Sequence, residues 1–189
     1  MTELDPFTDV LDGPVYVVTA ASGGERDGCL VGLASQCSID PPRFTVWLSI
    51  ANRTYQVARE AEYLTVHLLR RDDRALAELF GGETGDEVVT FARVGWRPGR
   101  AGSPVLEQAP IWFTGRIEGR IEGGDHVGFL LAPVAVCPPM EGPPPPLPGA
   151  RPPGLRPRAG PLSPTSGGGA RLNGAERVRR RIWCESGTR

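Results

Sequence analysis

The chain has 189 residues, 40% of them hydrophobic, which suits one domain with a core but is too short for two ordinary domains. The formal net charge of −1 hides an asymmetry, because residues 1–137 carry 12 Arg and 19 acidic residues whereas residues 138–189 carry 9 Arg and 3 Glu. We expect no nucleic-acid partner.

The rest of the composition argues against two further classes. Four cysteines without C-x-x-C spacing and only two histidines speak against a zinc site. No apolar run is long enough to span a membrane, and the acidic start MTELDPFTD lacks the apolar core of a signal peptide. We therefore expect a cytoplasmic protein with reduced thiols, no metal and no membrane partner.

Two strands are predicted near the start of the chain. Residues 14–20 are β-branched, aromatic and continuous, which is typical of a strand buried on both faces. Residues 22–24 form a turn signal, and residues 28–36 are the second predicted strand. Cys29 and Cys37 accompany this run, so we expect both thiols to be buried as small hydrophobic groups.

A rigid break at residues 40–42, Asp-Pro-Pro, precedes a strand over residues 43–50. This strand has the two-residue period of a half-buried strand, with an apolar set formed by Phe44, Val46, Leu48 and Ile50. Thr54 is then predicted to cap a short helix that ends at Ala61. Its inward side chains are expected to be Val57, Ala58 and Ala61.

The middle of the chain predicts a strand, a helix and a long connection. Residues 63–69 form the strand, and Asp72 is the predicted N-cap of a helix that stops at Gly81. The inward face of that helix should carry Leu76, Leu79 and Phe80. Residues 81–104 are rich in glycine and are predicted to form a long excursion from the barrel. Phe91 and Trp96 are expected to anchor this excursion to the barrel.

Two long strands end the ordered part. Residues 111–122 predict a strand with Gly115 and Gly119 at bulges and with one solvent-exposed (wet) face that carries cross-strand charges. That face is predicted to consist of Thr114, Arg116, Glu118, Arg120 and Glu122. After a Gly-Gly turn, residues 126–136 predict a strand that is apolar on both faces and so suits contact with a second subunit.

The composition changes abruptly after Cys137. Residues 138–189 hold 12 Pro and 9 Gly in 52 positions, which cannot bury enough surface to offset backbone entropy. We expect a domain over residues 1–137 and a disordered tail over residues 138–189. A polyproline ligand at residues 143–148 is the less favoured interpretation of this tail.

A phosphate site is the functional hypothesis that residue types suggest between residues 28 and 54. Hydroxyls of Ser35 and Ser38, a helix start at Thr54 and the fixed charge of Arg53 are suitable donors for a phosphate. Small residues such as Ala34 would let a ring system approach the main chain. A plain strand–turn–strand unit with a capped helix after it explains the same residues equally well.

An ordered series of motifs favours the first interpretation. The series begins with Gly28-x(6)-Ser35-x-x-Ser38-x-x-Pro41-Pro42 and continues with Asn52-Arg53-Thr54, Val66-His67-Leu68-Leu69, Leu76…Phe80, Pro104-Val105-Leu106 and Gly124-Asp125-His126. Over about residues 10–136 this series resembles the flavin reductase-like family, the FMN-binding split barrels. Family members usually continue with further barrel-edge sequence, from which residues 138–189 depart.

The resemblance implies a mainly β fold, a split β-barrel with a few short helices that forms a homodimer. It also implies noncovalent FMN, or FAD in some members, and NADH or NADPH as hydride donor. Reduced flavin would then diffuse to a separate monooxygenase. By the same resemblance, His126 is the predicted catalytic residue, and the predicted cofactor-binding residues are Leu33, Ala34, Ser35, Gln36, Ser38, Asn52, Arg53 and Thr54.

Other interpretations stay open from sequence. His126 could be a turn histidine bonded to Asp125, and His67 is expected to pack or to form hydrogen bonds rather than bind a ligand. The chain could be a flavin reductase, or a non-catalytic or differently catalytic FMN-binding protein on the same barrel. A weaker alternative is an inert domain with an anion-binding or nucleic-acid-binding tail.

Overall fold

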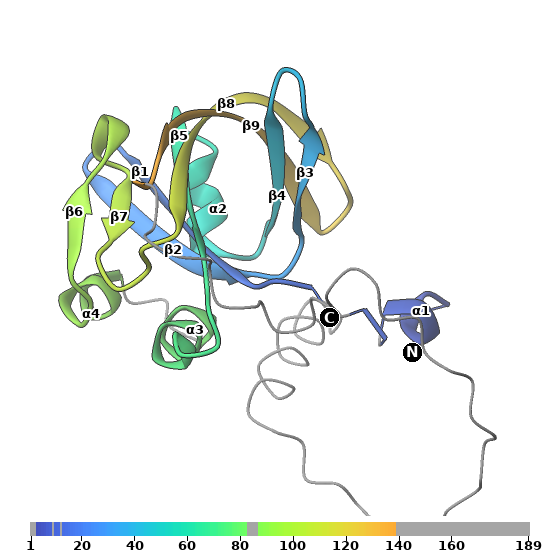
Figure 1. The fold of residues 1–189 in the computed structure, drawn as a ribbon, viewed down its shortest axis with the longest axis horizontal. Coiled ribbons are helices and arrows are strands. Elements are labelled where there is room, and N and C mark those ends of the chain that lie inside the picture. Colours follow the sequence, from blue (N-terminus) through green and yellow to red (C-terminus); the bar gives the residue numbers. More distant parts are fainter. Residues whose placement is uncertain (1–2, 9, 12, 83–86, 139–189) are drawn as a thin grey trace, which may run out of the picture.

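The computed structural model describes residues 3–8, 10–11, 13–82 and 87–138. A seven-stranded antiparallel sheet in the order β2-β1-β5-β8-β9-β4-β3 curves around the helix α2, as Figure 1 shows. Its strands are β1 (Tyr16–Ser22), β2 (Glu25–Val31), β3 (Ala34–Ser38), β4 (Arg43–Ser49), β5 (Tyr63–Leu68), β8 (Trp112–Glu122) and β9 (His126–Val136).

The remaining elements are short. A two-stranded sheet of β6 and β7 packs beside the barrel together with helices α3 and α4. Their bounds are α1 (Asp5–Thr8), α2 (Arg53–Ala58), α3 (Arg74–Gly81), α4 (Glu87–Ala92), β6 (Trp96–Pro98), the 3₁₀ helix η1 (Arg100–Gly102) and β7 (Pro104–Leu106). The expected mainly β fold with a few short helices is confirmed.

The predicted strand over residues 28–36 is wrong, because two strands occupy this stretch. Strand β2 begins at Glu25 and pairs with β1, whereas β3 begins at Ala34 and pairs with β4 at the opposite edge of the sheet. The chain passes from one edge to the other at Gly32 and Leu33, where the Leu33 carbonyl accepts a hydrogen bond from the Trp47 amide at 2.9 Å. The other five predicted strands are confirmed to within two or three residues.

The barrel interior is one apolar cluster. Fully buried side chains from opposite walls, such as Val18, Val46 and Phe129, meet there. Helix α2 closes this interior with Val57 and Ala58, as the sequence predicted. One end is lined by aromatic rings, since Phe44 makes edge contacts with Tyr16 and Phe113 at centroid distances of 5.7 and 5.3 Å.

A second apolar cluster lies outside the barrel, over β1, β2 and β5. It contains Leu76 and Phe80 of α3, Phe91 of α4 and Leu106 of β7. The rings of Phe91 and Trp96 meet edge to face at 5.9 Å, so these residues do anchor the excursion. The excursion is more regular than predicted, because α4, β6, η1 and β7 form within it.

The predicted helix caps are wrong in detail. The N-cap of α2 is Asn52, without a side-chain bond, and Thr54 lies inside the helix. The N-cap of α3 is Asp73 rather than Asp72, and Gly81 is the last helical residue rather than the stop. Asp73 instead accepts a hydrogen bond from the Arg70 amide at 2.7 Å, which fixes the turn before the helix.

Strand β8 carries both predicted bulges. The register with β9 shifts between Thr114 and Gly115 and again between Ile117 and Gly119. A Cβ atom at Gly115 would lie 2.7 Å from the Leu131 Cβ, so the strands approach too closely there for any side chain.

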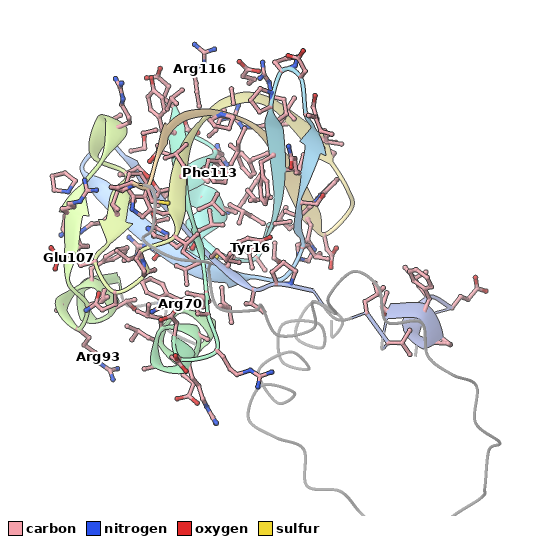
Figure 2. All side chains as sticks on the ribbon, in the orientation of Figure 1. Tyr16, Arg70, Arg93, Glu107, Phe113 and Arg116 are labelled. Atoms are coloured by element: carbon pink, nitrogen blue, oxygen red, sulfur yellow. The ribbon has the colours of Figure 1, made fainter. Side chains whose placement is uncertain are left out.

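The wet face of β8 is only partly as predicted. Figure 2 shows Arg116 pointing away from the barrel and Phe113 pointing into it. Arg116 donates a hydrogen bond to Glu118 at 2.9 Å, and this bond is the main cause of the lowered pKa of Glu118. Thr114 is buried instead, because its hydroxyl meets that of Thr65 at 3.0 Å beneath the excursion.

Several other predictions concern single residues or the tail. Cys29 is buried as expected, but Cys37 is exposed, since it lies on the edge strand β3. Burial raises the pKa of Cys29 to about 12.

The predicted disordered tail lies outside the described residues. Among the described helices, none has the length and apolarity needed to cross a membrane.

Candidate functional site

The predicted cofactor-binding residues of β3 lie along β4 at the edge of the sheet. Ala34 is opposite Val46, Ser35 is opposite Thr45, and Gln36 is opposite Phe44. Paired residues of an antiparallel ladder point to the same face. Ala34 and Gln36 therefore point to the side of the barrel interior, and Ser35 points to the outside with Thr45.

The edge strand β3 is exposed to solvent on both faces. Ser35 and Gln36 are exposed, and the Gln36 side-chain amide donates to the Ser38 carbonyl at 3.0 Å. An open depression of about 580 Å³ adjoins them and is lined by residues 36–40. The polar side chains of Gln36 and Ser38 are therefore among the residues that line this shallow depression.

A second group of predicted residues follows β4. Asn52 and Arg53 begin α2, and the Arg53 side chain is exposed. Its Nη2 atom lies 3.8 Å from the Glu25 carboxylate, which is also exposed. Because α2 has only six residues, the charge of Arg53 rather than the helix end is the suitable partner for a phosphate.

Thr54 is placed differently from the other predicted ligands. Its side chain is fully buried, and its hydroxyl donates to the carboxylate of Asp27 at 2.7 Å. This bond joins α2 to β2 at the residue next to Arg53. The Thr54 hydroxyl therefore stabilises the site from within the core and does not line its surface.

His126, the predicted catalytic residue, begins β9 and pairs with Ser49 at the end of β4. The Asp125 carbonyl accepts a hydrogen bond from the Ile50 amide at 3.0 Å. This bond joins the turn that carries His126 to the loop that leads to Arg53. Two predicted parts that are distant in sequence thus lie at the same end of β4.

The His126 ring is held on one side. Its Nδ1 atom lies 2.9 Å from Asp125 Oδ1, and since a carboxylate accepts, Nδ1 donates. This is the contact expected of a turn histidine. Among the described residues no hydrogen bond is formed by Nε2, so that atom can serve a bound molecule as well.

His67 is confirmed as a structural residue. It is fully buried, its Nδ1 donates to the Val17 carbonyl at 3.1 Å, and its Nε2 accepts from the Leu106 amide at 3.0 Å. Burial lowers the pKa of His67 to about 4, so the ring is neutral near pH 7.

Sequence reasoning missed three residues around the site. Glu25 faces Arg53, Asp27 holds Thr54, and Trp47 lies on the turn that carries His126. Glu25 and Asp27 lie two residues apart on β2, just before Gly28. A strand predicted from Glu25, rather than from Gly28, would have included both. The part of the chain that the structure describes contains no group of three His, Cys, Asp or Glu side chains that could hold a metal.

Residues 9–148 match the flavin reductase like domain. A probable flavin reductase of Rhizobium meliloti is 28% identical over 123 residues, which is 65% of this chain and 39% of that protein. The FMN reductase (NADH) RutF of Klebsiella pneumoniae is 31% identical over 130 residues, which is 67% of this chain and 78% of that protein. The chain thus spans well under half of the first relative and most of the second.

Solved structures share the fold. A putative flavin reductase of Haemophilus somnus has a TM-score of 0.65 at 22% identity and covers 71% of this chain and 88% of its own. The NADH:FAD oxidoreductase SgcE6 of Streptomyces globisporus, in complex with NAD and FAD fragments, has a TM-score of 0.59 at 24% identity and covers 66% and 73%. BorF, the flavin reductase component of a bacterial two-component tryptophan halogenase, has a TM-score of 0.63 at 24% identity and covers 70% and 84%. The chain belongs to the flavin reductase-like family.

Proposed function

We propose that this protein is an NAD(P)H-dependent flavin reductase that transfers a hydride from nicotinamide to FMN. The observation that carries the proposal is the joining of the His126 turn to the loop before Arg53 through the bond between the Asp125 carbonyl and the Ile50 amide. This bond brings a candidate phosphate cation and a largely buried imidazole to the end of β4, whereas the polar strip of β3 lies along the first half of β4.

The donor set fits a phosphate-bearing flavin. Arg53 supplies an exposed fixed charge, and Ser35 and Gln36 supply exposed hydroxyl and amide groups along the strip. Ala34, opposite Val46, keeps the main chain accessible to a flat ring. Leu33, Ser38 and Asn52 complete the predicted binding residues, through backbone groups or a partly buried hydroxyl.

In the proposed mechanism the residues of this chain bind and orient the reactants. Bound FMN would supply the redox chemistry, since its ring accepts the hydride. Arg53 would hold the phosphate, and polar groups of β3 would hydrogen-bond the flavin. Asp125 fixes the His126 ring through Nδ1, which leaves Nε2 for a contact with the dinucleotide.

Relatives support the choice of reactants. The Klebsiella protein is named an FMN reductase that uses NADH, so we propose FMN and NADH first, with FAD and NADPH as alternatives. BorF is titled the reductase component of a two-component halogenase. We accordingly propose that reduced flavin leaves this protein for a separate monooxygenase. Free thiols at Cys29, Cys37 and Cys137 suit a reducing, cytoplasmic setting.

We also propose a homodimer through the outer face of β4, β8 and β9. Ile121 is 49% exposed there, and Leu130 is half-buried. Figure 1 shows the covering elements α3, α4, β6 and β7 on the other side of the barrel, over β1 and β2. Sedimentation of the full chain tests this surface, since Ile121→Glu should convert a dimer to a monomer.

The activity is tested by mixing the purified full chain with FMN and NADH and following the absorbance of reduced nicotinamide. A reductase consumes NADH at a rate that depends on both FMN and protein. FMN binding without NADH or NADPH consumption would overturn the proposal and leave an FMN-binding protein of another kind. Absence of flavin binding as well would point to an inert barrel.

A further inference from the structure

Trp47 occupies the centre of β4 on the outer face, opposite Gly128 of β9. Its neighbours Val46 and Leu48 point into the barrel and are fully buried, so the indole points outward and is half-buried. Its backbone amide donates to Leu33, next to the predicted flavin strip. The residue thus stands between the β3 strip and the turn that carries His126.

The indole rests on two glycines. A Cβ atom at Gly123 would lie 2.6 Å from the Trp47 Cζ3 atom, and one at Gly128 would lie 3.0 Å from the same atom. Distances from Gly128 to the Trp47 Cε3 and Cη2 atoms would be 3.1 Å. The six-membered part of the indole therefore lies directly against the main chain at both positions, with no room for a side chain between.

These glycines bracket His126. Gly123 lies three residues before it and Gly128 two residues after it, and the Gly123 amide donates to the His126 carbonyl at 2.9 Å. The residues between Gly123 and His126 are exposed, and Gly124 has a φ of +91°. Backbone pairing with β4 and β8 holds this hairpin in the sheet, and the indole adds a side-chain contact on its outer face.

We propose that Trp47 is a positioning residue for His126, which holds the Gly123–Gly128 hairpin against β4 and so sets the place of the imidazole at the end of this strand. The strand pairing of Ser49 with His126 fixes the spacing along β4. The indole packs on the hairpin from the outer face of the sheet. The consequence for the dinucleotide rests on the proposed reductase function, whereas the consequence for the His126 ring does not.

The test compares Trp47→Phe and Trp47→Leu with Trp96→Phe, whose ring packs on Phe91 in the cluster on the other side. The chain has two histidines, so the imidazole signals of the ligand-free full chain are assigned by His126→Ala. We expect the His126 signal to broaden or split in both Trp47 variants, while the His67 signal stays sharp. Trp96→Phe should leave the His126 signal unchanged.

Activity adds a second readout. In Trp47→Phe the apparent KM for the nicotinamide substrate should rise about five-fold or more, while the Kd for FMN stays within about two-fold. Gly128→Ala, which pushes the indole outward, should give the same pattern. An unchanged His126 signal in Trp47→Leu overturns the proposal.

Further outcomes also test whether Trp47 positions His126. If the KM and the FMN Kd rise in parallel, Trp47 has a general packing role and the positioning proposal is overturned. The proposal is also overturned if the His126 signal changes only when a dimer dissociates in sedimentation. A changed His126 signal in a protein that never oxidises NADH or NADPH supports the positioning role and overturns the reductase assignment alone.

Discussion

Arg53 is the residue whose charge the proposed phosphate site depends on most directly. It is the exposed cation at the end of the loop after β4, and its interaction with Glu25 at 3.8 Å is between two exposed groups. Exposed pairs contribute up to about 1 kcal/mol, so a phosphate can compete for the guanidinium. A charge-assisted hydrogen bond to phosphate is worth about 1.5–3 kcal/mol, and solvent exposure favours the lower end.

We expect Arg53→Ala to weaken FMN binding about ten-fold and riboflavin binding hardly at all, because riboflavin lacks the phosphate. Fluorescence titration with both ligands measures this difference. Glu25→Gln is the matched control, since removal of the competing carboxylate should tighten FMN binding modestly, up to about three-fold. Equal weakening of both ligands by Arg53→Ala would rule out the phosphate contact.

His126 gives a prediction of a different kind at the same scale. If its Nε2 atom serves the dinucleotide, His126→Ala should slow flavin reduction by about ten-fold or more with FMN affinity nearly unchanged. Stopped-flow bleaching of the flavin measures the reduction rate. Asp125→Asn, which keeps the ring but weakens the contact with Nδ1, should fall between the wild type and His126→Ala. The same rate and dinucleotide affinity in His126→Ala would leave His126 as a turn residue only.

At the scale of elements, β7 is fastened to the barrel by buried polar groups rather than by strand pairing. The Thr19 hydroxyl donates to the Pro104 carbonyl at 2.6 Å, and the Ser103 hydroxyl lies 2.9 Å from that of Thr65. His67 adds the third link, through the Leu106 amide. Each group is buried and partnered, so loss of one partner leaves an unsatisfied buried group and costs about 1–3 kcal/mol.

The His67 link makes stability depend on pH. Burial lowers the folded-state pKa of His67 to about 4 from 6.5. Between these values the unfolded chain binds a proton that the folded chain refuses, so the free energy of unfolding falls as pH falls through this window. We expect a loss of about 2 kcal/mol from His67 between pH 7 and pH 5. Urea unfolding at the two pH values measures the total change.

His67→Gln should flatten this part of the pH dependence. Because that variant could fail to fold, the wild-type imidazole signal of His67 supplies an independent measurement. It should not titrate between pH 7 and pH 5, since its pKa lies below this range. A His67 signal that titrates near pH 6.5 would show that the ring is not held neutral by burial.

At the scale of the whole molecule, we propose that residues 1–137 suffice for the flavin site. Every element that positions the predicted ligands lies before Cys137, whose amide closes the end of β8 with the Trp112 carbonyl at 2.9 Å. A chain that ends at Cys137 should bind FMN as the full chain does and lose little thermal stability. Hydrogen exchange on the full chain should show residues 138–189 unprotected at the earliest time.

The family match sharpens this test, because it extends to residue 148. A second truncation after Pro148 separates the two boundaries. If only the longer chain folds or binds FMN, residues 138–148 complete the barrel and the boundary at 137 is wrong. Protection of the later tail from exchange would show that it too packs on the domain.

Local pattern was enough for most strands. The alternation of residues 43–50, the glycines at the β8 bulges and the apolar run of β9 each depend on neighbours along the chain, and all three reappear in the structure. The buried role of His67 also followed from its place on a strand. The ordered motif series identified the family, and residues 9–148 confirm it.

Long-range packing decided the rest, because the same local sequence can be satisfied by several partners. Residues 28–36 look like one strand, yet β2 and β3 lie at opposite edges of the sheet, since each finds a different partner. Thr54 has the chemistry of a cap, but Asp27 from β2 holds its hydroxyl in the core.

The site itself shows the same division. The residue types of the proposed phosphate site came from the sequence by itself, because a phosphate requires donors and a cation, whereas the proposed role of His126 came from the family resemblance. Only the tertiary structure decided that Ile50 meets Asp125 and that Trp47 lies on Gly123 and Gly128, since these contacts join segments that are far apart in the chain.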